Sequence, residues 1–123
     1  MAGVDDVRDA SGIACAEPTE PEPSLGSGAR IWLFRHGEVH EDWQGRAYGG
    51  MDVPLSERGR ADTLRVAERF GTLPFRAVLS SNLMRARMLG ELLAECSGAP
   101  LTISAGLAEI ARGRWQGRTV ADL

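Results

Sequence analysis

The sequence predicts an α/β fold built on a parallel sheet, of which this chain contains the front portion. Short apolar runs, typical of buried parallel strands, occur at residues 30–34, 75–79 and 101–103. Two longer segments with helical periodicity separate these runs, and strands that alternate with helices form parallel sheets with right-handed crossovers. These strands and helices are too few to cover both faces of such a sheet, so we expect an incomplete domain.

The first predicted strand, residues 30–34, leads directly into Arg35, His36 and Gly37. Ligands of open α/β sheets bind just outside the carboxyl ends of the strands. Arg35 offers a planar cation suited to phosphate or carboxylate groups, and His36 offers a nitrogen that acts as a base or nucleophile near neutral pH. Gly37 allows the backbone to turn sharply and to approach a ligand closely. We therefore expect an active site at this strand end.

A long loop and a helix are predicted next. Residues 38–54 show neither helical nor strand periodicity and are rich in glycine, and long loops in compact domains tend to be functional. The helix follows with Ser56 as its N-cap and an apolar residue every three positions up to Phe70. Gly71, with Pro74 just beyond it, is expected to end this helix.

The rest of the chain repeats this pattern once. After the second predicted strand, residues 80–82 are polar and can cap a second helix over about residues 83–96, which has its own apolar face. The third strand is followed by glycine-rich loops over residues 107–118. The last five residues, 119–123, have the composition of a helix that begins and makes one turn.

Charge is distributed unevenly along the chain. Residues 1–29 contain six acidic residues and one Arg, are rich in Pro, Gly and Ser, and are predicted to form a disordered acidic tail. Residues 30–123 contain thirteen Arg and eleven acidic residues, a mildly basic balance that suits an anionic substrate. The overall net charge of −3 gives no electrostatic case for binding nucleic acid.

The sequence favours a cytoplasmic protein that does not associate with membranes. It contains no run of 18 apolar residues and no segment with the basic start and apolar core of a signal peptide. Its two cysteines, Cys15 and Cys96, lie in the tail and on a predicted helix, so we expect no disulfide framework. The oligomeric state is left open.

Several segments follow residues 35–37 in a distinctive order. They are Gly45-Arg46 with Gly49 to Gly59, Ser80 to Ala86, Leu107-Ala108-Glu109 and Gly113 to Thr119. Together with Arg-His-Gly they resemble, over about residues 31–123, the motifs of the histidine phosphatase (phosphoglycerate mutase-like) superfamily. The branch of small phosphatases, which includes α-ribazole phosphatase and broad-specificity phosphatases, is the most similar. The resemblance implies a three-layer α/β/α fold with a mostly parallel sheet, of which residues 30–123 form the N-terminal part.

The resemblance also implies a reaction, the hydrolysis of a small phosphorylated metabolite without metal or cofactor. Arg35 and Arg85 would bind the phosphoryl oxygens, where phosphoryl transfer depends on electrostatic stabilisation. His36 would attack phosphorus in line to form a phosphohistidine intermediate. Glu109 would protonate the leaving oxygen and then deprotonate the incoming water.

Two further residues are weaker candidates for phosphate binding. Arg46 either lines the pocket or is simply solvated. Asp42 occupies the position where the family often has Asn, and its negative charge near a phosphate implies looser or different binding there.

Three alternatives stay open. The family has a second catalytic His followed by Gly on a later strand, whereas this chain contains only His36 and His40, so we expect it to end before the second half of the domain. An inactive protein that binds a phosphorylated ligand or a partner is therefore the first alternative. A phosphoglycerate mutase is a lesser one, because the expected substrate-binding insertions are not visible. A metal site at His36 and His40 has helical zinc-ligand spacing, but Gly37 argues against a helix there.

Overall fold

The computed structural model describes residues 28–123, so the predicted acidic tail lies, except for its last two residues, outside the described residues. The described chain contains two helices and two strands, in the order α1 (Glu57–Phe70), β1 (Val78–Ser80), α2 (Met84–Ser97) and β2 (Leu101–Ile103). Short 3-10 turns occur at Glu41–Trp43, Ala105–Leu107, Gly113–Trp115 and Val120–Asp122. Within residues 28–123 no helix is long and apolar enough to cross a membrane.

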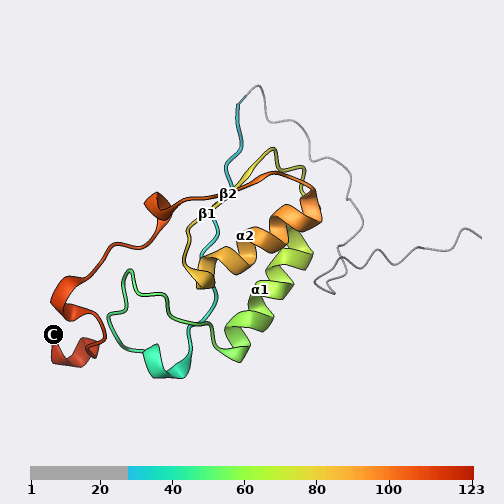
Figure 1. Ribbon diagram of the computed structural model, residues 1–123. Coiled ribbons are helices and arrows are strands. Elements are labelled where there is room, and N and C mark those ends of the chain that lie inside the picture. Colours follow the sequence, from blue (N-terminus) through green and yellow to red (C-terminus); the bar gives the residue numbers. More distant parts are fainter. Residues whose placement is uncertain (1–27) are drawn as a thin grey trace, which may run out of the picture.

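Strands β1 and β2 pair in parallel, which confirms the predicted α/β class with a parallel sheet. The register sets Val78 opposite Leu101 and Ser80 opposite Ile103. Helix α2 connects the two strands (Figure 1) and so forms the expected βαβ crossover. The second strand is shorter than predicted, because ladder pairing begins only at Val78 rather than at Phe75.

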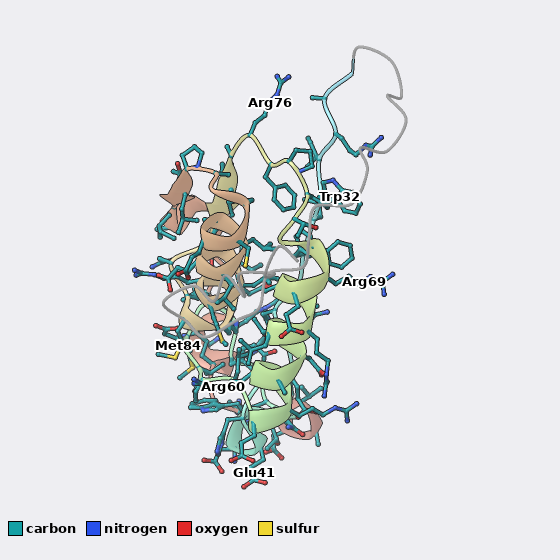
Figure 2. The ribbon with its side chains drawn as sticks, turned by 90° about the vertical axis from the view of Figure 1, so that its right-hand side faces the viewer. Trp32, Glu41, Arg60, Arg69, Arg76 and Met84 are labelled. Carbon is teal, nitrogen blue, oxygen red and sulfur yellow. The ribbon has the colours of Figure 1, made fainter. Side chains whose placement is uncertain are left out.

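The first predicted strand, residues 30–34, is wrong as a strand. A strand requires a partner backbone, and in the described residues the sheet contains only β1 and β2. The side chains nevertheless alternate as they would in a strand. Trp32 and Phe34 lie against Phe70 at the end of α1, with ring centroids 5.8 and 5.4 Å from its ring, and Figure 2 shows Trp32 at that end of the helix. Leu33, between them, is 92% exposed.

Both helices lie close to their predicted ranges, and α1 has its predicted cap. The predicted capping of α2 by residues 80–82 is wrong, because the N-cap of α2 is Leu83, which makes no side-chain cap bond. The hydroxyl of Ser56 accepts the backbone N–H of Gly59 at 2.9 Å and caps α1. Gly71 directly follows α1 and has right-handed backbone angles, with a φ of −64°. A Cβ at this position would stand 2.6 Å from the Cβ of Cys96, which makes Gly71 the point where the end of α1 approaches α2.

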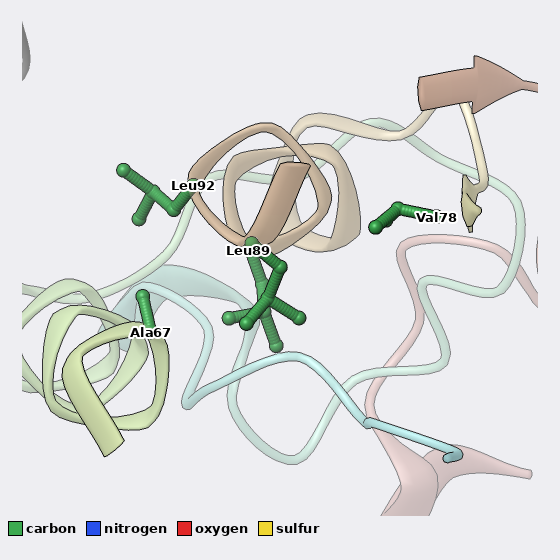
Figure 3. Close-up of a cluster of buried hydrophobic side chains, with 5 residues drawn as sticks. Ala67, Val78, Leu89 and Leu92 are labelled. Carbon is green, nitrogen blue, oxygen red and sulfur yellow. The ribbon is translucent and has the colours of Figure 1, made fainter. Parts of the chain in front are cut away.

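The core lies between the two helices and one face of the sheet. Helices α1 and α2 pack side by side (Figure 1), and the buried cluster takes residues from α1, α2 and β1 (Figure 3): Ala67, Val78, Leu89, Leu92 and Leu93. On β1 the side chains of Val78 and Ser80 are buried, whereas Leu79 points the other way and is 63% exposed. The described residues therefore cover one face of the sheet, as expected of an incomplete three-layer domain.

The expectation of a chain without a disulfide is wrong, because Cys96 near the end of α2 is disulfide-bonded. Cysteine spacing gives no signal for a disulfide at Cys96, because only the fold determines which residues approach it.

Candidate active site

The two ring nitrogens of His36 have different roles. Its Nδ1 lies 2.7 Å from the carbonyl oxygen of Gly37. A carbonyl oxygen can only accept a hydrogen bond, so Nδ1 carries the proton and donates it. The lone pair of the neutral ring is then on Nε2. This tautomer leaves Nε2 free to act as a nucleophile.

The environment of His36 favours the neutral ring. Burial lowers the pKa of His36 most strongly, and the positive charges of Arg85 and Arg35 lower it further. The hydrogen bond to Gly37, which is the second-largest influence, and the smaller effect of the negative charge of Glu109 raise the pKa. The net effect is a pKa below the usual value of 6.5, so the ring is unprotonated at neutral pH. The three charged residues that the sequence singled out therefore all act on His36.

The backbone that carries His36 lies directly against the first turn of α1. A Cβ on Gly37 would stand 2.5 Å from the carbonyl oxygen of Gly59, and a Cβ on Gly59 would collide with the carbonyl of Glu38. The carboxylate of Glu38 accepts the hydroxyl of Ser56 at 2.7 Å, which ties the same segment to the helix cap. Gly37 has no positive φ, so it serves close backbone approach to Gly59 rather than a sharp turn.

Arg85 is almost completely buried, with 2% of its surface exposed. It lies in the first turn of α2. Its Nη1 donates to the carbonyl oxygen of Met51 at 2.6 Å, and its Nη2 donates to that of Gly49 at 2.7 Å. The guanidinium also lies 5.0 Å from the centre of the Tyr48 ring. Together these contacts fix the plane of the guanidinium.

The turn of Gly49, Gly50 and Met51, called here the glycine turn, connects Arg85 to Glu109. On one side its carbonyls hold the guanidinium. On the other side it packs against the backbone after Glu109: a Cβ on Gly49 would stand 2.8 Å from the carbonyl oxygen of Ile110, and one on Gly50 would stand 3.2 Å from that of Glu109. Gly49 also has a positive φ of 45°. Two adjacent glycines thus allow the acid and the cation to approach the same turn.

Glu109 itself lies in an irregular segment after β2. Its side chain is 48% exposed, and one carboxylate oxygen lies 3.4 Å from Nη2 of Arg112. Its charge reaches His36. The structure therefore places a solvent-accessible carboxyl group near the histidine, where it can exchange protons with water.

An open hollow of about 390 Å³ lies at His36. We call it the His36 hollow, and it is lined by Arg35, His36, Gly37, Glu38, Val39, Gln44, Gly45 and Tyr48. Gln44 and Tyr48 are lining residues that the sequence reasoning missed. The available signal for Tyr48 was its place directly before the glycine turn. Its contact with Arg85 could not be predicted from the sequence, because the two residues are 37 positions apart.

Arg46 and Asp42 lie apart from the lining of this hollow. Arg46 donates to the carbonyl oxygen of Asp42 at 3.0 Å and to that of Gly117 at 2.8 Å. It thereby helps to join the loop before the glycine turn to the C-terminal segment, which runs beside that loop in Figure 1. The carboxylate of Asp42 lies 3.4 Å from Nδ1 of His40. A direct role of Arg46 or Asp42 in phosphate binding stays a prediction.

The alternative of a metal site finds no ligand set in the described part of the chain. Residues 28–123 contain no group of three His, Cys, Asp or Glu side chains that could hold a metal ion. His40 caps the turn Glu41–Trp43 through Nδ1, which accepts the N–H of Asp42 at 3.3 Å. Its nearest described partner is thus Asp42 rather than His36.

Comparison with known proteins agrees with this arrangement. The family model of the histidine phosphatase superfamily (branch 1) matches residues 31–123. A relative from Citrobacter koseri, named "Probable phosphoglycerate mutase GpmB", is 33% identical over 94 residues, which are 76% of this chain and 44% of the relative. The chain thus spans less than half the length of the curated relatives it matches.

Solved structures show the same relationship. A mycobacterial glucosyl-3-phosphoglycerate phosphatase in complex with VO3 superposes with a TM-score of 0.64 and 34% identity, over 70% of this chain and 41% of that protein. A candidate α-ribazole-5′-P phosphatase from Escherichia coli K-12 superposes with a TM-score of 0.66 and 32% identity, over 75% of this chain and 46% of that protein. The chain belongs to the histidine phosphatase superfamily, branch 1.

Proposed function

We propose that this chain is the nucleophile-bearing part of a phosphomonoester hydrolase that acts through a phosphohistidine on a small phosphorylated metabolite. The observation that carries the proposal is the state of His36. Its Nδ1 is tied to the carbonyl of Gly37, its Nε2 is free, and its pKa lies below the usual value because of burial and two neighbouring arginines. A neutral histidine surrounded by cations is suited to attack a dianionic phosphate.

The reaction proceeds in two displacements. In the first, Nε2 of His36 forms a bond to phosphorus while the ester P–O bond breaks, and the leaving oxygen takes a proton from the carboxylic acid of Glu109. In the second, the Glu109 carboxylate removes a proton from water as the water oxygen attacks phosphorus and the P–N bond breaks. Arg35 and Arg85 stabilise the equatorial phosphoryl oxygens in both steps. No metal or cofactor enters this scheme.

The names of similar proteins support a small phosphorylated substrate. They include a phosphatase of glucosyl-3-phosphoglycerate, a candidate phosphatase of α-ribazole-5′-P and a phosphoserine phosphatase solved with 3-phosphoglyceric acid. The relative named as a mutase acts, by its name, on phosphoglycerate. We infer a phosphomonoester of low molecular weight, and we keep the cytoplasmic location as a prediction.

A second candidate function is binding of a phosphorylated ligand without turnover. It is compatible with the same arrangement, because the positive charges of Arg35 and Arg85 act on His36 and would attract a phosphate whether or not His36 attacks it. The phosphate would then be held by Arg35 and Arg85 beside an idle His36.

Phosphate trapping separates the two functions. The protein is incubated with para-nitrophenyl phosphate, quenched in base, and analysed for phosphate bound to protein that is stable to base and labile to acid. The hydrolase is supported if the unsubstituted protein and His40→Asn both hydrolyse the substrate and carry bound phosphate. His36→Asn should then show neither hydrolysis nor bound phosphate. Vanadate binding measured by calorimetry without hydrolysis or label supports the binding function. Hydrolysis without label at His36 would contradict the proposed mechanism.

A further inference from the structure

Helix α2 is capped by a residue from a distant segment. Its N-cap residue, Leu83, has no side-chain hydrogen bond to the first turn. Instead, Oδ1 of Asp52 accepts the backbone N–H of Met84 at 2.8 Å. Met84 is the first residue of α2, and Figure 2 shows it at that end of the helix. A carboxylate at this point also has favourable electrostatics, because helix N-termini carry partial positive charge.

The same short segment therefore contacts α2 at two successive residues. Asp52 directly follows the glycine turn, and its side chain bonds to Met84. The glycine turn itself bonds to the guanidinium of Arg85 through the carbonyls of Gly49 and Met51. The two attachments join a loop to a helix more than thirty positions away, so neither can be set by local geometry.

These contacts restrict where the guanidinium can lie. Arg85 has a long side chain with several rotatable bonds, and its bonds to the glycine turn and its contact with the ring of Tyr48 hold its end in place. The glycine turn itself needs an anchor on α2, because its two glycines have more backbone freedom than other residues. The bond from the backbone N–H of Met84 to Asp52, the residue after Met51, provides such an anchor.

We propose that Asp52 is a positioning residue, which holds the glycine turn on α2 and thereby keeps the guanidinium of Arg85 beside His36. The proposal rests on the proposed function insofar as Arg85 binds the phosphoryl group. A plain helix cap would stabilise α2 without affecting the charge environment of His36. The two roles therefore differ in a property that can be measured at the histidine.

The test compares three substitutions in the full chain by following the imidazole signals in NMR titrations. Asp52→Ala removes the acceptor, Asp52→Asn keeps an acceptor oxygen without the charge, and Asp62→Ala removes an exposed carboxylate of α1 that pairs only with Arg58 and Arg65 in the described structure. His40→Asn assigns the two histidine signals. Vanadate affinity is measured by calorimetry on the same proteins, and their melting temperatures are recorded.

We expect Asp52→Ala to raise the pKa of His36, because the Arg85 cation that helps to lower this pKa would be displaced. We also expect its vanadate dissociation constant to rise about tenfold, the effect of misplacing one charge-assisted hydrogen bond. Asp52→Asn and Asp62→Ala should retain the titration and vanadate affinity of the unsubstituted chain. If Asp52→Ala does not fold, Asp52→Ser takes its place with the same expected direction.

A lower melting temperature of Asp52→Ala with unchanged His36 titration would overturn the proposal and leave Asp52 a helix cap. Equal changes in Asp52→Asn and Asp52→Ala would also overturn it, because the charge rather than the bond would then be responsible. Failure of the unsubstituted chain to bind vanadate would count against the proposed function, and the histidine titration would still decide the role of Asp52.

Discussion

Gly37 and Gly59 lie backbone to backbone, with the carbonyl oxygen of Gly59 only 2.5 Å from where a Cβ of Gly37 would stand. One glycine belongs to the segment that carries His36, and the other belongs to the first turn of α1. Their contact sets the nucleophile directly on the start of a helix. Hydrogen bonds from Ser56 to Glu38 and from Gly59 to Ser56 reinforce the same junction.

This junction predicts that Gly59→Ala destabilises the chain. Replacing Gly by Ala inside a helix gains about 1 kcal/mol of propensity, but the new methyl group would collide with the backbone of Glu38. Backbone cannot move aside as a flexible side chain can, and overpacking costs about 1–3 kcal/mol. We expect a net loss of up to about 2 kcal/mol in the free energy of urea unfolding. Gly28→Ala, where nothing lies within 4 Å of the added methyl, serves as the control, and a more stable Gly59→Ala would contradict the packing.

The lowered pKa of His36 predicts a pH dependence of stability. Because the folded pKa lies below the unfolded value near 6.5, the unfolded chain binds more protons in the interval between them. The contribution of neutral His36 is therefore present above pH 6.5 and is lost as the pH falls through the folded pKa. As the pH falls from 7.5 to 5, the unsubstituted chain should lose stability relative to His36→Asn. Free energies of urea unfolding of both proteins measure this loss. A difference that stays constant over this range would show that the pKa is not lowered.

Arg85 is predicted to matter for both folding and anion binding. Arg85→Gln cannot reach both carbonyls of the glycine turn, and each unsatisfied buried acceptor costs about 1–3 kcal/mol. The variant should also bind vanadate more weakly and should titrate His36 at a higher pH, since a cation that lowers its pKa is removed. Arg87→Gln, two residues along α2, removes an exposed cation that pairs with Glu91 and should change neither. Equal behaviour of the two variants would refute the placement of Arg85.

Burial predicts opposite outcomes for two leucines. Leu93 is 3% exposed in the core between the helices. Its replacement by Ala should lower the free energy of unfolding by about 2–5 kcal/mol. Leu33, 92% exposed on the uncovered side of its segment, should change the free energy of unfolding by no more than about 0.5 kcal/mol in this chain. Urea unfolding of Leu93→Ala and Leu33→Ala measures both. A large loss for Leu33→Ala would show that another part of the chain covers this side.

The sequence by itself determined the features that depend on neighbouring residues. Helix limits follow from the cap at Ser56 and the apolar periodicity, and the α/β class follows from the alternation of apolar runs with helices. The resemblance of residues 35–37 and the later segments to family motifs selected His36, Arg35, Arg85 and Glu109. These signals are local because caps, turns and periodicity act within a few residues.

Only the tertiary structure decided how the selected residues meet. It showed that within residues 28–123 the sheet contains only β1 and β2, so the predicted strand at residues 30–34 is not part of that sheet. It showed that Gly37 serves the approach of α1 and that the carbonyls of Gly49 and Met51 hold Arg85. The cap from Asp52 to Met84 joins segments 32 positions apart. No local pattern encodes such contacts, because they arise only when packing brings distant backbone groups within bonding distance.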